Sequence, residues 1–176
     1  KYADAVRAHE PSISVEEAEF LLCSLESVDP CDVVLEIGTH RGCSARLWRD
    51  VLVPDLLVTV DWEPMLEGQD MDDIEVVRGH RSQDEESYDR VRELLDGRSV
   101  DFLFIDGGHK YWEVKTDWEL YGPLVRPGGL IAFHDIYVRN ELHDVYALWR
   151  ELSRQSHPVL RTSSVTGSTG MGVLRV

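Results

Sequence analysis

Short runs of β-branched and apolar residues alternate with segments of helical periodicity along most of the chain. Each run is almost unbroken, with at most two polar residues, and the runs lie at residues 33–37, 57–61, 74–77, 101–105 and 130–133. Unbroken apolar runs are typical of strands that are buried on both faces of a sheet. The alternation of strands with helices predicts βαβ units, and therefore an α/β fold with a mostly parallel sheet.

Helical periodicity fills the connections at residues 44–52, 85–95 and 111–121. Near the start, Ser14 and Glu17 form a capping box, which predicts a leading helix that covers the sheet and stops before Asp29-Pro30. A longer helix is expected between residue 135 and His157-Pro158. Its apolar positions, spaced by three and four residues, are Leu142, Val145, Tyr146, Trp149 and Leu152.

Two last strands are expected at residues 159–162 and 171–176, around a Gly/Ser/Thr loop short enough for a hairpin. This hairpin would complete a seven-stranded, mostly parallel sheet with an antiparallel C-terminal strand and helices on both faces. With 176 residues and 43% hydrophobic content, the chain has the size of one domain. We expect the leading helix within residues 1–30 and the core within 31–176.

The net charge of -15 at pH 7 argues against nucleic acid as a partner, because phosphate binding requires a basic surface. Anionic membrane surfaces are disfavoured for the same reason, and no apolar run reaches the roughly 20 residues that span a bilayer. We therefore expect a soluble, cytoplasmic protein.

The acidic, lysine-poor composition has two explanations, adaptation to high salt or codon bias in a GC-rich genome. The cysteines form no CxxC pair and are expected to be reduced thiols: Cys23, Cys31 and Cys43.

The first apolar run leads into the sequence VVLEIGTHRGCSARLW, where Gly38 and Gly42 bracket a tight turn that opens a helix. Such a turn lets a ligand approach the backbone at a helix N-terminus. The dinucleotide fingerprint requires glycine where this chain has His40, so NAD and FAD are disfavoured. The loop also lacks the lysine of a Walker A motif, which disfavours nucleoside triphosphates. A ligand without a pyrophosphate remains, and the alternative is a plain turn with packing glycines.

Asp61 ends the second apolar run, about 20 residues beyond the glycine loop, where an acidic side chain can accept hydrogen bonds from two ribose hydroxyls. The alternative is that Asp61 only begins a turn before Trp62-Glu63-Pro64. The spacing favours the ribose interpretation.

The most distinctive block is DFLFIDGGHKYWEVKTDWELYGPLVRPGGLIAFHDI. Through its IDGGH and PGGLIAFHD motifs, the chain resembles class I S-adenosylmethionine-dependent methyltransferases from about residue 33 to 136. The similarity is to the family of macrocin O-methyltransferase-like and cephalosporin-hydroxylase-like proteins, and the terminal GMGVL strand resembles that family's last strand. The resemblance implies a Rossmann-like methyltransferase fold, S-adenosyl-L-methionine as cofactor and a small-molecule acceptor.

The resemblance also implies roles for individual residues. Around the methionine part of the cofactor it implies Glu36, Gly38, Thr39, Gly42 and Ser44. It assigns the ribose to Asp61. It implies that the adenine lies at Gly79, His80 and Ser82, where related sequences have G-D-S and His80 departs from the pattern. Metal ligands and acid–base groups gather in relatives at the positions of Asp106, His109, His134 and Asp135, and Asp106 also faces the cofactor.

If the runs at 101–105 and 130–133 form neighbouring strands, their ends lie about 4.8 Å apart and Asp106 and Asp135 open onto one crevice. Two carboxylates there repel each other unless a cation or a proton separates them. An all-oxygen set suits Mg²⁺, whereas His109 or His134 would admit Mn²⁺, Fe²⁺ or Zn²⁺. We expect Asp106, His134 and Asp135 as ligands of Mg²⁺ or Mn²⁺. The alternative is that Asp106 meets only the cofactor, Asp135 caps a helix and the histidines are structural.

This polar cluster favours O-methylation, because a hydroxyl needs a metal or a base to become nucleophilic, whereas an amine needs less help. Two other functions stay open, a metal-dependent oxygenase or hydrolase that uses the same aspartates, and a non-catalytic cofactor-binding Rossmann protein. The chain leaves little room for a substrate lid. A partner subunit in a homo-oligomer is therefore one way to complete the pocket.

Overall fold

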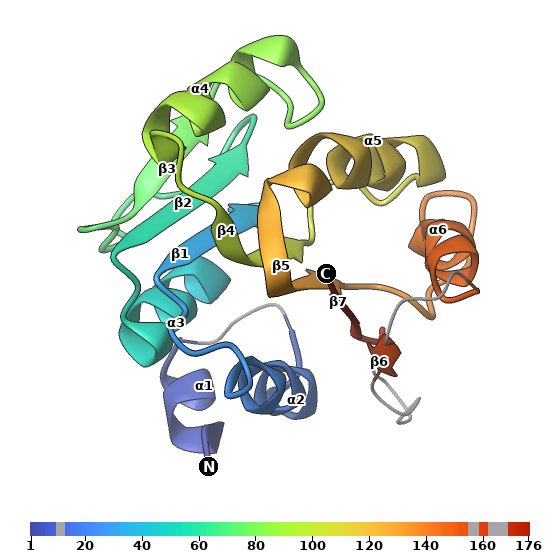
Figure 1. Cartoon of the computed structure of the whole chain (residues 1–176), viewed down its shortest axis with the longest axis horizontal. Coiled ribbons are helices and arrows are strands. Elements are labelled where there is room, and N and C mark those ends of the chain that lie inside the picture. Colours follow the sequence, from blue (N-terminus) through green and yellow to red (C-terminus); the bar gives the residue numbers. More distant parts are fainter. Residues whose placement is uncertain (10–12, 155–158, 162–168) are drawn as a thin grey trace.

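The structure is a computed structural model of the chain, and it describes residues 1–9, 13–154, 159–161 and 169–176. Helices and strands alternate through most of the described part (Figure 1). The helices are α1 Ala3–His9, α2 Val15–Leu25, α3 Cys43–Leu52, α4 Glu85–Leu95, α5 Tyr111–Tyr121 and α6 Val145–Leu152, and a 3-10 helix covers Gly122–Leu124. The strands are β1 Val33–Ile37, β2 Leu56–Asp61, β3 Glu75–Arg78, β4 Val100–Ile105, β5 Val125–Phe133, β6 Val159–Arg161 and β7 Gly172–Arg175.

The strands form one seven-stranded sheet in the order β3-β2-β1-β4-β5-β7-β6. The first five strands pair in parallel, whereas β7 runs antiparallel to both β5 and β6. The predicted α/β fold with an antiparallel C-terminal strand is therefore confirmed. Strand order reverses between β1 and β4, and a crevice for ligands opens at such a switch point, beyond the carboxyl ends of the strands.

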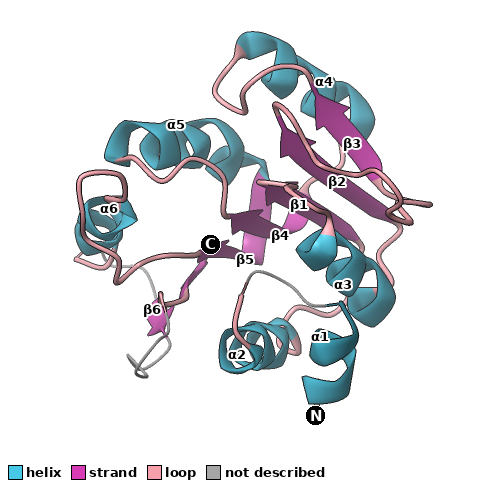
Figure 2. Cartoon of the chain, turned by 180° about the vertical axis from the view of Figure 1, so that it is seen from behind, coloured by secondary structure: helices cyan, strands magenta, loops and turns pink. Residues whose placement is uncertain are grey.

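Helices cover both faces of the sheet, as predicted (Figure 2). On one face α1, α2 and α3 pack against alternate strand residues such as Phe102 and Phe104. On the other face α4, α5 and α6 pack against the intervening residues, such as Leu103 and Ile105. Every residue of β1 and β4 is buried, including Glu36 and Asp101, as expected for central strands covered on both faces.

Several boundaries differ from the sequence prediction. The leading helix ends at Leu25, before Asp29-Pro30, and the short helix α1 precedes it. Leu142 lies outside α6 and is exposed, because the helix begins only at Val145. The predicted stop at His157-Pro158, the end of the penultimate strand at residue 162 and most of the Gly/Ser/Thr loop lie outside the described residues.

The three cysteines are free thiols, as predicted. No helix in the described part of the chain is long and apolar enough to cross a membrane.

Candidate active site

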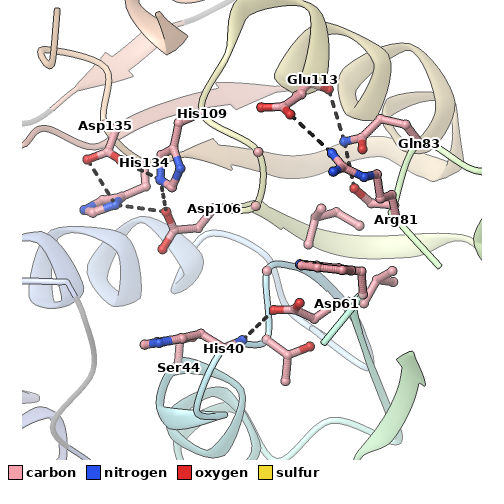
Figure 3. A pocket seen from close by; sticks show the side chains of 18 of the residues that line it. His40, Ser44, Asp61, Arg81, Gln83, Asp106, His109, Glu113, His134 and Asp135 are labelled. Atoms are coloured by element: carbon pink, nitrogen blue, oxygen red, sulfur yellow. Dashed lines mark hydrogen bonds and ion pairs between the residues drawn. The ribbon is translucent and has the colours of Figure 1, made fainter. Parts of the chain in front are cut away.

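A cavity of about 570 Å³ opens at the carboxyl ends of β1, β2, β4 and β5 (Figure 3). Its wall combines the loop between β1 and α3, the end of β2, the segment between β3 and α4, and the residues that follow β4 and β5. The cavity thus lies at the switch point of the sheet, where α/β proteins bind their ligands.

The two loop glycines, Gly38 and Gly42, pack against different parts of the structure. Gly38 lines the cavity and has φ +103°, and a Cβ atom there would lie 2.2 Å from the carbonyl oxygen of Asp106. Gly42 has φ +69° at the N-cap of α3, outside the cavity wall, and a Cβ atom there would lie 2.6 Å from Sδ of Met71. Both glycines are therefore required by backbone conformation and close packing.

Asp61 lies in the cavity wall beside the glycine loop. Its Oδ2 accepts the backbone N–H of His40 at 2.8 Å, and its Oδ1 accepts that of Glu63 at 3.1 Å. The side chain thus organises the turn after β2 while it faces the cavity. The turn interpretation and the ribose interpretation of Asp61 are therefore compatible.

Glu36 does not line the cavity but is completely buried beneath the glycine loop. Its carboxylate accepts hydrogen bonds from Trp48 Nε1 at 3.1 Å and Thr59 Oγ1 at 2.8 Å. The Thr59 hydroxyl also lies 2.7 Å from that of Thr39, which does reach the cavity wall. Burial raises the pKa of Glu36 to about 7, although its hydrogen bonds oppose the shift. The residue therefore supports the loop from below.

At the end of the cavity near β3, Ser82 lies in the wall, whereas Gly79 and His80 do not. Three neighbours that the sequence did not single out do line the cavity: Trp62, Arg81 and Gln83. Ser44, by contrast, lies in the wall as the resemblance implies.

At the other end, the four predicted acid–base residues all lie together in the wall. His134 is buried between carboxylates, with Nδ1 3.0 Å from Asp106 Oδ1 and 3.5 Å from Asp135 Oδ1. Burial by itself would lower the pKa of His134, but the hydrogen bonds with Asp106 and Glu17 outweigh it and raise the pKa to about 10. The raised pKa favours the protonated imidazole, whose positive charge would lie beside both aspartates and reduce their mutual repulsion.

His109 forms a second pair with Asp135, because its Nε2 lies 2.9 Å from Asp135 Oδ2. This hydrogen bond raises the pKa of His109. Burial by itself would raise the pKa of Asp135, but the hydrogen bond with His109 and the charge of His134 bring it below its usual value. The His109 ring is 37% exposed and accessible from the cavity.

Sequence patterns missed several groups that complete this cluster. Glu17 appeared only as a capping residue, yet its Oε2 lies 3.7 Å from His134 Nε2, and Thr169 Oγ1 lies 2.9 Å from the same nitrogen. His143 stacks against His109, with ring centroids 4.6 Å apart. Glu17 and Thr169 are remote in the sequence from the IDGGH and PGGLIAFHD motifs, and His143 lies beyond the second of these motifs, so only the fold shows that all three lie at this cluster.

Comparison with known proteins agrees with this geometry. The sequence model of a family described as "Methyltransferase domain" matches residues 35–136, which is more than half of the chain. The chain belongs to this methyltransferase family. The matched segment runs from β1 to the residue after Asp135, and it contains the glycine loop, Asp61 and the acid–base cluster.

Solved structures show the same fold at low sequence identity. The MycE methyltransferase of the mycinamycin biosynthetic pathway, in complex with Mg, SAH and mycinamycin VI, has a TM-score of 0.72 and 16% identity, over 98% of this chain and 53% of that one. The O-methyltransferase TomG of Streptomyces achromogenes, in complex with SAM, has a TM-score of 0.68 and 19% identity, over 99% and 86%. An O-methyltransferase from Bacillus cereus with SAH has a TM-score of 0.62 and 17% identity, over 98% and 89%.

Two curated relatives match over shorter segments. Protein y4gI of Sinorhizobium fredii is 39% identical over 59 residues, and protein R132 of Acanthamoeba polyphaga mimivirus is 44% identical over 52 residues. These segments cover 34% and 28% of this chain, and 6% and 24% of the relatives.

Proposed function

We propose that the chain binds S-adenosyl-L-methionine and transfers its methyl group to a hydroxyl group of a small molecule. The observation that carries this proposal is one continuous cavity, with the glycine loop and Asp61 in one part of its wall and the His109–Asp135 pair in another. A methyltransferase needs both parts, a cradle for the cofactor and a polar group for the acceptor. Family membership independently favours a methyltransferase over an oxygenase, a hydrolase or a non-catalytic binder.

The residues of the wall fit the cofactor. Gly38, Thr39 and Ser44 would surround its methionine part, Asp61 would accept hydrogen bonds from the ribose hydroxyls, and Ser82 lies at the end expected for the adenine. Glu36, Gly42, Gly79 and His80 would act by supporting the loops, because they lie outside the wall. When bound, S-adenosylmethionine supplies a methyl group on a positively charged sulfur, ready for in-line displacement.

The His109–Asp135 pair would prepare the acceptor. Asp135 raises the pKa of His109 through their hydrogen bond, which makes the His109 ring a stronger proton acceptor for a hydroxyl. His134, which contacts both Asp106 and Asp135, would fix the position of the Asp135 carboxylate and stabilise its negative charge. An acidic protein with a charge of -15 suits a small-molecule acceptor better than nucleic acid.

The predicted metal set of Asp106, His134 and Asp135 offers three ligand atoms within 4.8 Å of one another, so a metal at this set stays a prediction. Both ring nitrogens of His134 already form hydrogen bonds, Nδ1 with Asp106 and Nε2 with Thr169. An ion at this set would have to replace one of these hydrogen bonds. We assign no step of the reaction to an ion at this set. The expected single domain, homo-oligomer and cytoplasmic location stay predictions.

Calorimetric titration with S-adenosylmethionine tests the proposal. We expect micromolar affinity for the wild type and a loss of roughly 1–3 kcal/mol in Asp61→Ala, because a charged acceptor of ribose hydrogen bonds is removed. Glu63→Ala is the matched control, since it removes the same charge two residues further along the chain and outside the cavity wall. Absence of binding by the wild type, or equal losses in the two variants, would contradict the proposed function.

A further inference from the structure

His109, Asp135 and His143 bring two imidazole rings and one carboxylate together at the rim of the cavity. Each offers one ligand atom, and the three atoms all lie within 4.8 Å of one another. The residues come from three segments, the loop after β4, the loop just after β5 and the loop before α6. The set differs from the one expected from the sequence, since it contains two histidines and neither Asp106 nor His134.

The hydrogen bonds of Asn140 determine which nitrogen of His143 is available. Asn140 Oδ1 lies 2.8 Å from the backbone nitrogen of Leu142 and 3.0 Å from that of His143, so this atom is an acceptor. His143 Nδ1 lies 3.1 Å from the same oxygen and must therefore donate its hydrogen. In a neutral imidazole the other nitrogen, Nε2, then carries the lone pair.

That lone pair is accessible. His143 Nε2 forms no hydrogen bond with any residue that the structure describes, and the side chain is partly exposed. Histidines that bind metals commonly donate the hydrogen of one ring nitrogen to an oxygen, which fixes the ring and directs the other nitrogen to the ion. The Asn140–His143 pair has this arrangement.

The loop that carries His143 is fastened beside His109. The backbone N–H of Asp144 donates to the carbonyl oxygen of His109 at 2.8 Å. Asn140 and His143 also exchange backbone hydrogen bonds of 3.2 and 3.3 Å, which closes the loop on itself. Asp135, with φ +59°, places its Oδ2 2.9 Å from His109 Nε2. Backbone contacts thus hold the three side chains near one another without an ion.

We propose that His109, Asp135 and His143 form a binding site for a divalent transition-metal ion of the Zn²⁺ and Co²⁺ type. Two imidazole nitrogens and one carboxylate favour such ions over Mg²⁺, which prefers oxygen ligands. Three protein ligands also leave coordination positions for water or for an oxygen of the acceptor. The site does not depend on the proposed methyl transfer. If both hold, His109, Asp135 and His143 would hold the ion, the ion would lower the pKa of an acceptor hydroxyl, and the hydroxyl proton would pass to solvent water in place of His109.

Titration of the full chain with Co²⁺, followed by its visible absorption and by calorimetry, tests this site. We expect one equivalent to bind with the spectrum of a site that contains nitrogen ligands, and Mg²⁺ in excess should not displace it. His143→Gln should weaken Co²⁺ binding by more than about 10-fold, because one of three ligands is lost. His9→Gln is the matched control, since it removes a histidine that also faces a carboxylate, with Nε2 2.8 Å from Asp50 Oδ2 on α3.

Asp106→Asn separates the two candidate metal sets, because Asp106 belongs only to the set with His134. The proposal expects this variant to bind Co²⁺ like the wild type. It is overturned if Asp106→Asn abolishes binding, if His143→Gln binds as tightly as His9→Gln, or if the wild type binds no Co²⁺. The titrations contain no S-adenosylmethionine, so a chain that fails the cofactor test can still pass this one.

Discussion

Asp117 is a carboxyl group buried in α5 with only part of its hydrogen-bonding capacity used. Its Oδ1 accepts a hydrogen bond of 2.8 Å from Gln83 Nε2, whereas Oδ2 has no partner in the described part of the chain. Burial raises the pKa of Asp117 to about 7, against the effect of its hydrogen bonds. Gln83 lines the cavity, so Asp117 holds a wall residue in place at a cost in stability.

We expect Asp117→Asn to stabilise the protein in a pH-dependent way. The unfolded chain loses the Asp117 proton near pH 4 and the folded chain near pH 7, so the folded state binds more protons in between and the wild type loses stability as pH rises through this range. The asparagine avoids this loss and still accepts from Gln83. The gain should grow from pH 4 to 7 and reach on the order of 1–3 kcal/mol at pH 8.

Urea unfolding at pH 5 and pH 8 measures this effect. Glu119→Gln is the control, because Glu119 lies on the same helix but is exposed and should show no such gain. An Asp117→Asn gain of equal size at both pH values would mean that ionisation of Asp117 is not its cause.

Other residues of the site show what the sequence could specify. Asp106 and Asp135 end two apolar runs, and the ends of adjacent parallel strands always lie together, so their meeting was predictable. The contact of Glu17 with His134 was not, because a capping box gives no sign of what the helix end touches in the fold. His143 was also missed, because the sequence placed it within the expected helix after residue 135, whereas in the structure α6 begins only at Val145.

At the scale of elements, the close approach of β1 and β4 shapes the cavity floor. Gly38 N–H donates to Val60 O at 2.8 Å, and Asp106 N–H donates to Ile37 O at 2.8 Å. These bonds extend the ladders just past the strand ends and leave no room for a side chain at Gly38. Any change at Gly38 therefore acts on the sheet itself, before it acts on a ligand.

We expect Gly38→Ala to destabilise the fold by more than the cost of placing alanine at a positive φ. Gly97→Ala is the matched control, because Gly97 also has positive φ, +77°, but nothing lies within 4 Å of its Cβ position. Gly97→Ala should cost about 1–2 kcal/mol from the left-handed conformation. Gly38→Ala should cost clearly more, since the Cβ would also meet backbone atoms of Asp106. Chemical denaturation of both variants measures the difference, and equal costs would refute the packing argument.

Most elements were predictable because each carries a strong periodicity of its own. The ranges of β1, α4 and α5 agree with the sequence prediction to the residue. Helix α1 was missed because it has seven residues and only Val6 is buried, which is too little for an amphipathic pattern. Leu142 fitted the spacing of α6, but Asn140 closes a turn with His143 and delays the start of the helix.

At the scale of the whole molecule, acidic side chains exceed basic ones by a wide margin. The chain has 33 Asp and Glu residues against 18 Lys and Arg residues. Ion pairs do form at the surface, for example between Arg90 and Glu93 at 3.0 Å, but the basic residues are too few to pair every carboxylate. Residues 61–75 include seven acidic and no basic side chains, and most of the segment is exposed or half-buried. Repulsion among carboxylates therefore opposes the compact state.

Salt should relieve this repulsion and decide between the two explanations of the composition. The Debye length shortens from roughly 30 Å at 0.01 M to 3 Å at 1 M salt, so distant carboxylates stop interacting. If the acidic surface is an adaptation to high salt, the melting temperature at pH 7 should rise markedly as KCl increases over this range. The control is the same series near pH 4.7, the isoelectric point of the sequence, where little net charge remains to be screened and the rise should disappear. A flat profile at pH 7 would favour codon bias, and a rise of equal size at both pH values would assign the effect to hydrophobic burial strengthened by salt.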